Sequence, residues 1–379
     1  MNKLKAFATA IILCFCTATF LSAKEPLRPE EKDYDVLLTA QEMLDSMDYG
    51  GALKMAMHAK NIRTQLCDWQ LFILEKELSP AAVRSKGDYL PDVLQILKER
   101  NSFDAVQIIS SLIEKKTDVF FDYSMKKLVS YISEKKAYPE ADFICGKVYQ
   151  FEGEYEMAMQ FYDAAVQNAD FLDIPAEKYE ILYQMAYLAQ QKNDNAEYEK
   201  YLLMILADDS LYYKNTVFCN AVMRTISSPA EKEPLKKFFS LYRVDSSNYL
   251  RAYNLISKYY LEYGETQKAV TAMALSVLSA FSKIYNVVHI REPYGNYSDF
   301  EELFIKMQEW EDITQWLQNN AVWETFISFA ELTENLGYRT FSEQLFIAVY
   351  NSCPEKYWKQ KIELHFHNRP LNNFRVSDN

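Results

Sequence analysis

The sequence predicts an all-α protein made of short antiparallel helices. Glycine is rare, with 8 residues in 379, where an average soluble chain contains ~7%. Parallel sheets, β-sandwiches and long catalytic loops need more glycine for their tight turns, whereas helices with short connections need least. From residue 33 onward no sustained two-residue alternation of apolar and polar side chains occurs. Strands are therefore not expected.

Prolines mark the expected helix starts. Proline in the first turn of a helix loses no hydrogen bond, and nearby acidic residues favour the positive end of the helix dipole. We expect helices to begin at or close to Pro80, Pro91, Pro139, Pro175, Pro229 and Pro354. Another is expected at the capping box Ser298-Asp299-Phe300-Glu301. Helices of ~10–15 residues joined by short turns are the general expectation.

One segment, from Ile144 to Val166, carries a specific pattern of small and aromatic residues. Gly146 and Tyr149 lie in the first helix, Gly153 and Tyr155 form the turn, and Ala158, Tyr162 and Ala165 line the second helix. Small residues let two helices approach closely, and a large ring of one helix fills the gap beside the small residue of the other. This unit resembles the tetratricopeptide repeat.

Four further segments match the same frame less completely. The critical small residue of the first helix is Ala40, Gly146, Ala186, Ser257 or Ala330 in the five frames, and Phe103, Ala105 and Ile109 hint at another unit. The turns at Gly153, Gly264 and Gly337 are not spaced at multiples of the ~34-residue period of the family. Some helices must therefore be longer, or some repeats atypical.

The resemblance implies one continuous, right-handed α-solenoid of degenerate helix pairs over residues 33–367. Residues 1–23 have the features of a cleaved signal peptide, with Lys3 and Lys5 before an apolar run and Leu21-Ser22-Ala23 as the cleavage site. A polar lead-in is expected at 24–32 and a flexible tail at 368–379. We expect export to the periplasm and no membrane span in the mature chain. An uncleaved anchor and a lipoprotein are the alternatives; the second is disfavoured because Cys14 and Cys16 follow bulky residues.

Charge and cysteine content limit the possible partners. A formal net charge of −12 argues against nucleic acid, since phosphate binding needs a basic face. Cys67, Cys145, Cys219 and Cys353 follow the leader without a C-x-x-C pair, which favours single buried thiols over zinc. His365 and His367 would point about 200° apart on a helix, so no metal site is expected.

No nucleophile elbow, zinc-protease motif, phosphate-binding loop or dinucleotide fingerprint is present. We therefore expect neither an enzyme nor a cofactor. The enzymatic alternative is an (α/α) toroid that acts on carbohydrate with two carboxylates and flanking aromatics. Its candidates are the acids Glu301, Glu302, Glu309, Glu311 and Asp312, with Trp310, Trp316 and Trp323 nearby. The simpler interpretation of these residues is a solvated acidic helix face with core tryptophans.

The resemblance also implies a binding surface, because the first helices of such repeats line a concave groove. Its expected residues here are Phe143, Lys147, Gln150, Tyr183, Tyr187 and Lys258. They would hold an extended peptide or an amphipathic helix, unless their rings only pack against neighbouring helices. The expected function is a protein-binding scaffold of the bacterial envelope, whose partner is an envelope or transport component. A small-ligand carrier is the remaining alternative.

Overall fold

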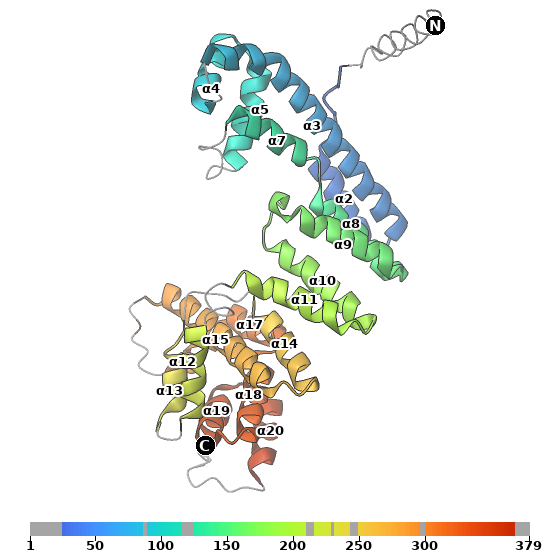
Figure 1. Ribbon diagram of the computed structural model, residues 1–379. Helices are drawn as coiled ribbons and strands as arrows, with labels where there is room; N and C mark the ends of the chain where they lie inside the picture. The colour runs from blue at the N-terminus through green and yellow to red at the C-terminus, as the bar shows by residue number, and fades with distance from the viewer. Residues whose placement is uncertain are drawn as a thin grey trace, which may run out of the picture. The chain divides into compact units, whose positions relative to one another are not determined.

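The computed structural model describes residues 25–85, 89–115, 124–209, 216–228, 231–242, 249–293, 295 and 300–367. Within these ranges every regular element is helical, and the one β-type contact is an isolated bridge between Tyr89 and Ser124. The prediction of an all-α fold is confirmed. The chain divides into two compact units, residues 1–178 and 179–379. Each is described by itself below (Figure 1).

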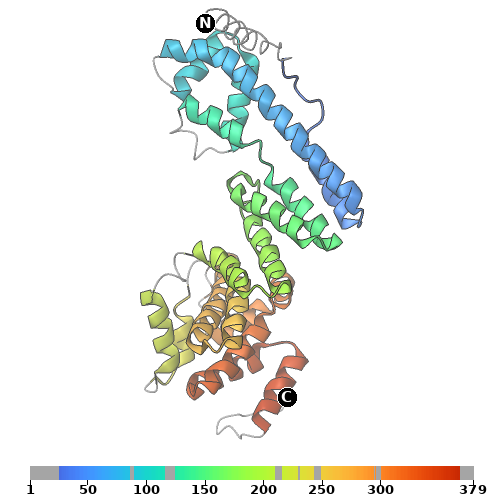
Figure 2. The same ribbon diagram turned by 45° about the vertical axis from the view of Figure 1, so that its right-hand side comes forward.

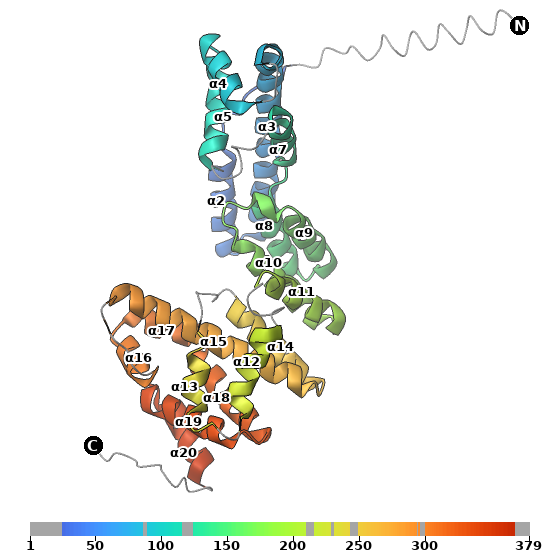
Figure 3. The same cartoon turned by 60° about the vertical axis from the view of Figure 1, so that its left-hand side comes forward.

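Unit 1 is organised around one unusually long helix. Its helices are α2 (Asp33–Asp45), α3 (Tyr49–Ser85), α4 (Leu90–Glu99), α5 (Phe103–Lys115), α7 (Met125–Glu134), α8 (Pro139–Glu152), α9 (Tyr155–Gln167) and the 3-10 helix η1 (Ala169–Phe171). The 37 residues of α3 pack against α2 and α8 toward one end and against α4, α5 and α7 toward the other (Figure 3). The first half of α3 thus completes a helix pair, and the second half supports additional helices.

Unit 2 is built around a central helix of 26 residues, α15. Its helices are α10 (Glu177–Gln191), whose first two residues belong to unit 1, α11 (Asn195–Ala207), α12 (Thr216–Ser227), α13 (Pro234–Phe239), α14 (Leu250–Glu262), α15 (Thr266–Arg291), α16 (Phe300–Met307), α17 (Glu311–Asn319), α18 (Val322–Asn335), α19 (Arg339–Ser352) and α20 (Lys356–His367). Helix α15 packs against α12, α14, α16 and α18 (Figure 2). Its apolar length is explained by this burial: it is the one described helix long and apolar enough to cross a membrane, and 67% of that stretch is buried.

Six helix pairs close with the same turn. A residue with positive φ follows the first helix, its N–H bonds the carbonyl three residues back, and the next N–H bonds the carbonyl five residues back. The positive-φ residues are Met47, Asn101, Gly153, Asn193, Gly264 and Gly337. This is the Schellman motif, which satisfies the last carbonyls of the first helix. The six pairs are α2–α3, α4–α5, α8–α9, α10–α11, α14–α15 and α18–α19.

The predicted small residues lie where the paired helices meet. Ala40, Gly146, Ala186, Ser257 and Ala330 are all buried. A Cβ atom at Gly146 would come within 2.4 Å of the Tyr162 ring, so glycine is needed there for the ring to fit. In α14–α15 the Ser257 hydroxyl donates to the carbonyl of Ala269 at 2.8 Å, and in α18–α19 the Ser342 hydroxyl donates to that of Ala330 at 2.8 Å.

The prolines met our expectation in most places. Pro91 and Pro139 lie in the first turns of α4 and α8, whereas Pro175 and Pro354 precede α10 and α20 by two residues. The predicted helix start at Pro80 is wrong, because Pro80 lies inside α3. Its neighbours Leu78 and Ala81 are buried in the core shared with α4 and α5, and this packing outweighs the cost of about 3 kcal/mol for proline in a helix interior.

Other sequence predictions concern residues that lie outside the described ranges. The signal peptide (1–23), the tail (368–379), Pro229 and the first two residues of the capping box, Ser298 and Asp299, lie outside the described residues. Residues 25–32 carry no helix, α2 begins at Asp33, and α20 ends at His367.

Candidate functional site

Three of the expected groove residues lie on α8 in unit 1. The Phe143 side chain is 8% exposed, its ring centroid lies 5.8 Å from that of Tyr162, and the Lys147 ammonium lies 4.1 Å from the Phe143 ring. Gln150 accepts a hydrogen bond from the Tyr162 hydroxyl at 2.5 Å. Phe143 and Gln150 thus contribute to the packing of α8 on α9, and Lys147 covers the outer side of the Phe143 ring.

The other three lie in unit 2. Tyr183 on α10 is 7% exposed and lies beneath the Arg251 guanidinium, 4.3 Å from its ring centroid. Tyr187, one turn further along α10, is 48% exposed. Lys258 on α14 is exposed, with its ammonium 3.8 Å from a Glu324 carboxylate oxygen. Tyr187 and Lys258 therefore present side chains to solvent, whereas Tyr183 supports Arg251.

The first helices of three pairs contact one another in unit 2. Arg251 of α14 lies 3.7 Å from Glu180 of α10. Asn254 of α14 donates to the Thr325 hydroxyl of α18 at 2.6 Å, and the contact between Lys258 and Glu324 joins the same two helices. We call the surface formed by Glu180, Tyr183, Tyr187, Arg251, Asn254, Lys258, Leu261 and Glu324 the first-helix face.

The ion pairs of this face are weak and accessible. Both are longer than 3.5 Å, and each of their four side chains is between 45% and 57% exposed. Exposed pairs of this kind contribute about 0–1 kcal/mol. Arg251 and Lys258 can therefore exchange Glu180 and Glu324 for the carboxylates of another molecule at little cost. Tyr187 and Leu261 add exposed apolar surface.

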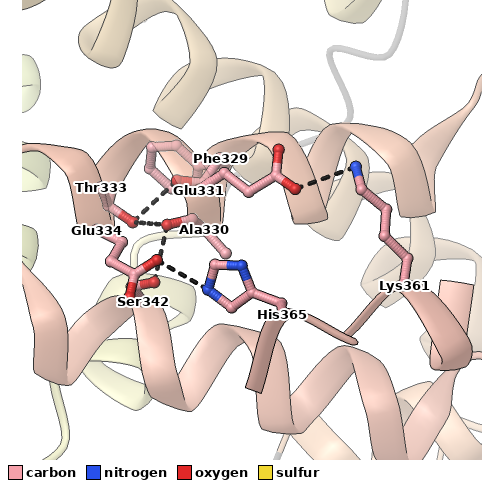
Figure 4. A network of polar contacts seen from close by, with 8 residues as sticks. All are labelled: Phe329, Ala330, Glu331, Thr333, Glu334, Ser342, Lys361 and His365. Carbon is pink, nitrogen blue, oxygen red and sulfur yellow. Dashed lines mark hydrogen bonds and ion pairs between the residues drawn. The ribbon is translucent and has the colours of Figure 1, made fainter. Parts of the chain in front are cut away.

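Helix α20 covers the continuation of this surface on α18 (Figure 4). The Lys361 ammonium lies 3.0 Å from a Glu331 carboxylate oxygen, and the His365 Nε2 atom lies 2.8 Å from one of Glu334. The hydroxyls of Thr333 and Ser342 donate to the carbonyl of Ala330 at 3.0 and 2.8 Å. The two hydroxyls thus find their acceptor within the α18–α19 pair. The acids Glu331 and Glu334 pair with Lys361 and His365 of α20.

A mainly apolar cavity of about 500 Å³ lies between α11, α12, α14 and α15 of unit 2. Leu203, Leu206, Ile256 and Leu275 supply apolar walls, while Glu199 and Lys268 are charged lining residues. Glu199 accepts a hydrogen bond from the Tyr260 hydroxyl at 2.8 Å. The volume is in the range of small-molecule pockets.

Two acids of the carbohydrate-enzyme alternative, Glu309 and Asp312, are held by cations. Glu309 lies 2.6 Å from the Lys306 ammonium, and Asp312 accepts two hydrogen bonds from Arg291 at 3.0 and 2.6 Å. The hydrogen bonds from Arg291 lower the pKa of Asp312, whereas a general acid needs a raised pKa. Trp323 is buried, at 2% exposed, and Trp310 and Trp316 pack against the same core. This arrangement agrees with the simpler interpretation, of a charged helix surface above core tryptophans.

Cys67, Cys145 and Cys353 are buried free thiols. Burial raises the pKa of Cys145 to about 12 and that of Cys353 to about 11, which keeps these thiols protonated and unreactive. No cluster of three His, Cys, Asp or Glu side chains with the geometry of a metal site occurs in the described ranges.

Comparison with known proteins gives relatives and no family: no family model matches the chain. The chain is 28% identical to an uncharacterized protein of Treponema pallidum (strain Nichols) over 363 residues, which cover 93% of this chain and 95% of that protein. It is 21% identical to an uncharacterized protein of Borreliella burgdorferi over 236 residues, 56% of this chain and 72% of that protein. The first similarity extends over both units.

Sequence reasoning found the first helices and the small residues between the paired helices, but not the contacts between pairs. It did not identify the Glu324 and Lys258 pair or the role of α20, because both depend on which helices become neighbours. It also did not identify a buried arginine, Arg63, in unit 1. A signal was present: Arg63 continues the buried stripe of Ala52, Ala56 and Ala59 along α3 at helical spacing.

Proposed function

We propose that this chain is a non-enzymatic scaffold, a solenoid of tetratricopeptide-like pairs exported to the bacterial periplasm, which binds a protein partner on the first-helix face. The observation that carries the proposal is the direct contact of α10, α14 and α18 through Glu180, Arg251, Asn254, Thr325, Lys258 and Glu324. Three first helices side by side provide a surface longer than one helix pair can offer. Similar surfaces bind extended peptides or amphipathic helices.

The expected partner is a protein segment with apolar side chains for Tyr187 and Leu261 and carboxylates for Arg251 and Lys258. Charge-assisted hydrogen bonds to these cations would replace weak internal ion pairs. An envelope or transport component is the proposed class of partner, because the leader directs the chain to that compartment. N-terminal sequencing of the exported protein should show a first residue near Lys24. A retained Met1 would mean that the leader is an uncleaved anchor.

Affinity capture from gently solubilised bacterial envelope tests the binding surface. The baits are the parent chain, a Tyr187→Ser/Lys258→Ser variant, and a Lys356→Ser/Tyr357→Ser control. The control changes the same two residue types on α20, where both side chains are exposed. We expect the parent and the control to retain one protein that the first variant loses. Equal retention by all three baits would place binding outside this face, and no retained protein would overturn the scaffold.

The cavity between α11, α12, α14 and α15 supports a second candidate, a carrier of a small apolar ligand. Its walls are mainly apolar, and Glu199 and Lys268 offer one charge of each sign. Native mass spectrometry of the chain purified from its own cell would show a bound mass under this alternative. The variant Ala272→Trp, which fills the cavity, should remove that mass, while the partner capture should be unchanged.

A further inference from the structure

Unit 1 contains a second cavity, of about 350 Å³, which the proposed scaffold role does not use. It lies between the segment before α2, the first two residues of α2, the middle of α3, helix α5, the end of α7 and the turn after η1. Its lining includes Arg28, Asp33, Arg63, Trp69, Gln107 and Asp173. At the ~30 Å³ that a water molecule occupies in the liquid, this volume holds about a dozen water-sized groups.

Arg63 is the most informative residue of this cavity. It is 7% exposed, its Nε donates to the carboxylate of Asp33, and its guanidinium carbon lies 3.6 Å from the centre of the Tyr138 ring. Its two terminal nitrogens, Nη1 and Nη2, make no hydrogen bond within the described part of the chain. A buried guanidinium fixed by a carboxylate on one edge and an aromatic ring on one face is pre-organised, and the remaining edge has the geometry that binds a carboxylate bidentately.

Two oxygen atoms beside Arg63 are buried without a partner among the described residues. These are the Tyr138 hydroxyl and Oε2 of Glu140, while Oε1 of Glu140 accepts from the Asp173 backbone N–H at 2.7 Å. Burial of an unpaired polar atom costs about 1–3 kcal/mol. Tyr138 and Glu140 are not among the lining residues of the cavity, so these two atoms belong to the polar wall behind Arg63.

The entrance of the cavity carries charges of both signs. Asp173 is exposed, with its backbone held by Glu140, and Arg28 is exposed with its guanidinium 5.3 Å from the Trp69 ring. Trp69 gives a flat apolar wall, and Gln107 and Ser111 offer neutral polar groups. Three cations, Arg28, Arg63 and Lys135, and two anions, Asp33 and Asp173, line the cavity. This nearly balanced set suits a ligand that itself carries both signs.

We propose that this cavity binds a free α-amino acid, with the ligand carboxylate on Nη1 and Nη2 of Arg63, the ligand ammonium at Asp173 and the ligand side chain along Trp69. The site lies wholly in unit 1. It is independent of the first-helix face in unit 2, and either proposal can fail without the other.

Isothermal titration calorimetry of the full chain with each of the twenty common amino acids tests the site. We expect at least one to bind, and its carboxamide and its N-acetyl derivative to bind at least about tenfold more weakly, because a desolvated charge contact is worth about 1.4 kcal/mol or more. Equal binding of the N-acetyl derivative would mean that the site recognises a simple carboxylate or a peptide C-terminus and not a free amino acid. No binding by any of the twenty would overturn the proposal.

Variants locate the binding within unit 1. Ser111→Met extends a side chain of α5 into the cavity while leaving Arg63 and Asp33 unchanged, and should abolish binding. Ser130→Met makes the same change on the exposed surface of α7 and should bind like the parent. Arg63→Lys keeps a positive charge beside Asp33 but loses the second nitrogen, and should weaken binding at least about tenfold. If Ser111→Met bound the amino acid as the parent does, the ligand would occupy another site.

Discussion

The two units use the same kind of helix pair but fill their cores differently. In unit 2 the core is aromatic: Phe238, Phe239, Phe281, Phe304, Phe326, Phe329, Phe341 and Phe346 are buried together. In unit 1 the long helix α3 buries Arg63 in line with Ala52, Ala56 and Ala59, and the buried Asp142 of α8 lies 2.5 Å from the Lys60 ammonium. Small residues therefore set how paired helices meet in both units, while the residues beyond them decide whether the core is filled with aromatic rings or includes buried charged groups.

The largest expected effect is in the aromatic core of unit 2. The Phe239 ring is 2% exposed and lies 4.4 Å from the ring of Phe281 and 5.0 Å from that of Phe300. Phe239→Ala should destabilise unit 2 by about 3–5 kcal/mol, because it leaves a cavity among rings that cannot collapse. Hydrogen exchange read by mass spectrometry separates the two units and should show faster exchange in α13, α15 and α16.

The control for this variant is Phe103→Ala in unit 1. Phe103 is 73% exposed, so its loss should change the free energy of unfolding by less than about 0.5 kcal/mol. An equal loss from the two substitutions would contradict the contrast between an aromatic core and an exposed ring.

The next effect concerns the buried charge of unit 1. Arg63→Met leaves the Asp33 carboxylate, whose side chain is 15% exposed, without its cation. We expect a loss of about 3 kcal/mol, seen as faster hydrogen exchange in α2 and α3. The double variant Arg63→Met/Asp33→Leu removes both charges and should recover most of that loss, because the cost comes from one unpaired charge. If the double variant were as unstable as the single one, the pair itself would be a major source of stability.

The sequence predicts a great deal of this fold because its determinants are local. Gly153, Gly264 and Gly337 mark turns that need a positive φ, and all three were found where the pattern placed them. Met47, Asn101 and Asn193 adopt the same conformation without glycine. The pair α4–α5 was only hinted at, because Leu94 and Val106 take the places of its small residues. The spacing from Gly153 to Gly264 is long because α10 to α13 intervene, and that from Gly264 to Gly337 is long because α15 extends beyond its pair and α16 and α17 follow it.

The candidate sites could be predicted less well because they depend on which helices become neighbours. The frame named Tyr187 and Lys258, which are exposed, but also Phe143 and Tyr183, which are buried. The position of Phe143 or Tyr183 within its first helix does not reveal that Tyr162 will pack against the first ring and Arg251 will lie over the second. The Pro80 error has a similar cause, since the packing of Leu78 and Ala81 on distant helices overrides a local signal.

A smaller effect tests the small-residue rule itself. Gly146→Ala introduces a Cβ atom 2.4 Å from a carbon of the Tyr162 ring, so the ring must move and its hydrogen bond to Gln150 must stretch. We expect a loss of about 1–3 kcal/mol, as for other overpacked cores. Gly50→Ala is the matched control, because nothing lies within 4 Å of its Cβ position in α3. That change should be neutral or stabilise the helix by up to about 1 kcal/mol. Denaturant melts of both variants give the comparison, and similar losses would contradict the rule.

The smallest effect is the pH dependence of the polar cluster in unit 1. Burial is the main reason that the pKa of Glu140 is raised above its ordinary 4.5, although the Asp173 backbone N–H opposes it. An acid with a raised pKa in the folded state binds its proton more tightly there, so its contribution to stability is present below pH 4.5 and is lost as the pH rises through the folded pKa.

Glu140→Gln removes this loss of stability. The variant should be more stable than the parent at pH 7, by less than about 1 kcal/mol, and the difference should shrink as the pH approaches 4.5. Glu152→Gln, which makes the same change at an exposed acid at the end of the same helix, is the control. Hydrogen exchange of α8 at several pH values, corrected for the intrinsic rate, measures the difference. A gap that widened toward acid pH would mean that the Glu140 carboxylate is stabilised in the fold, and its pKa would then be lowered and not raised.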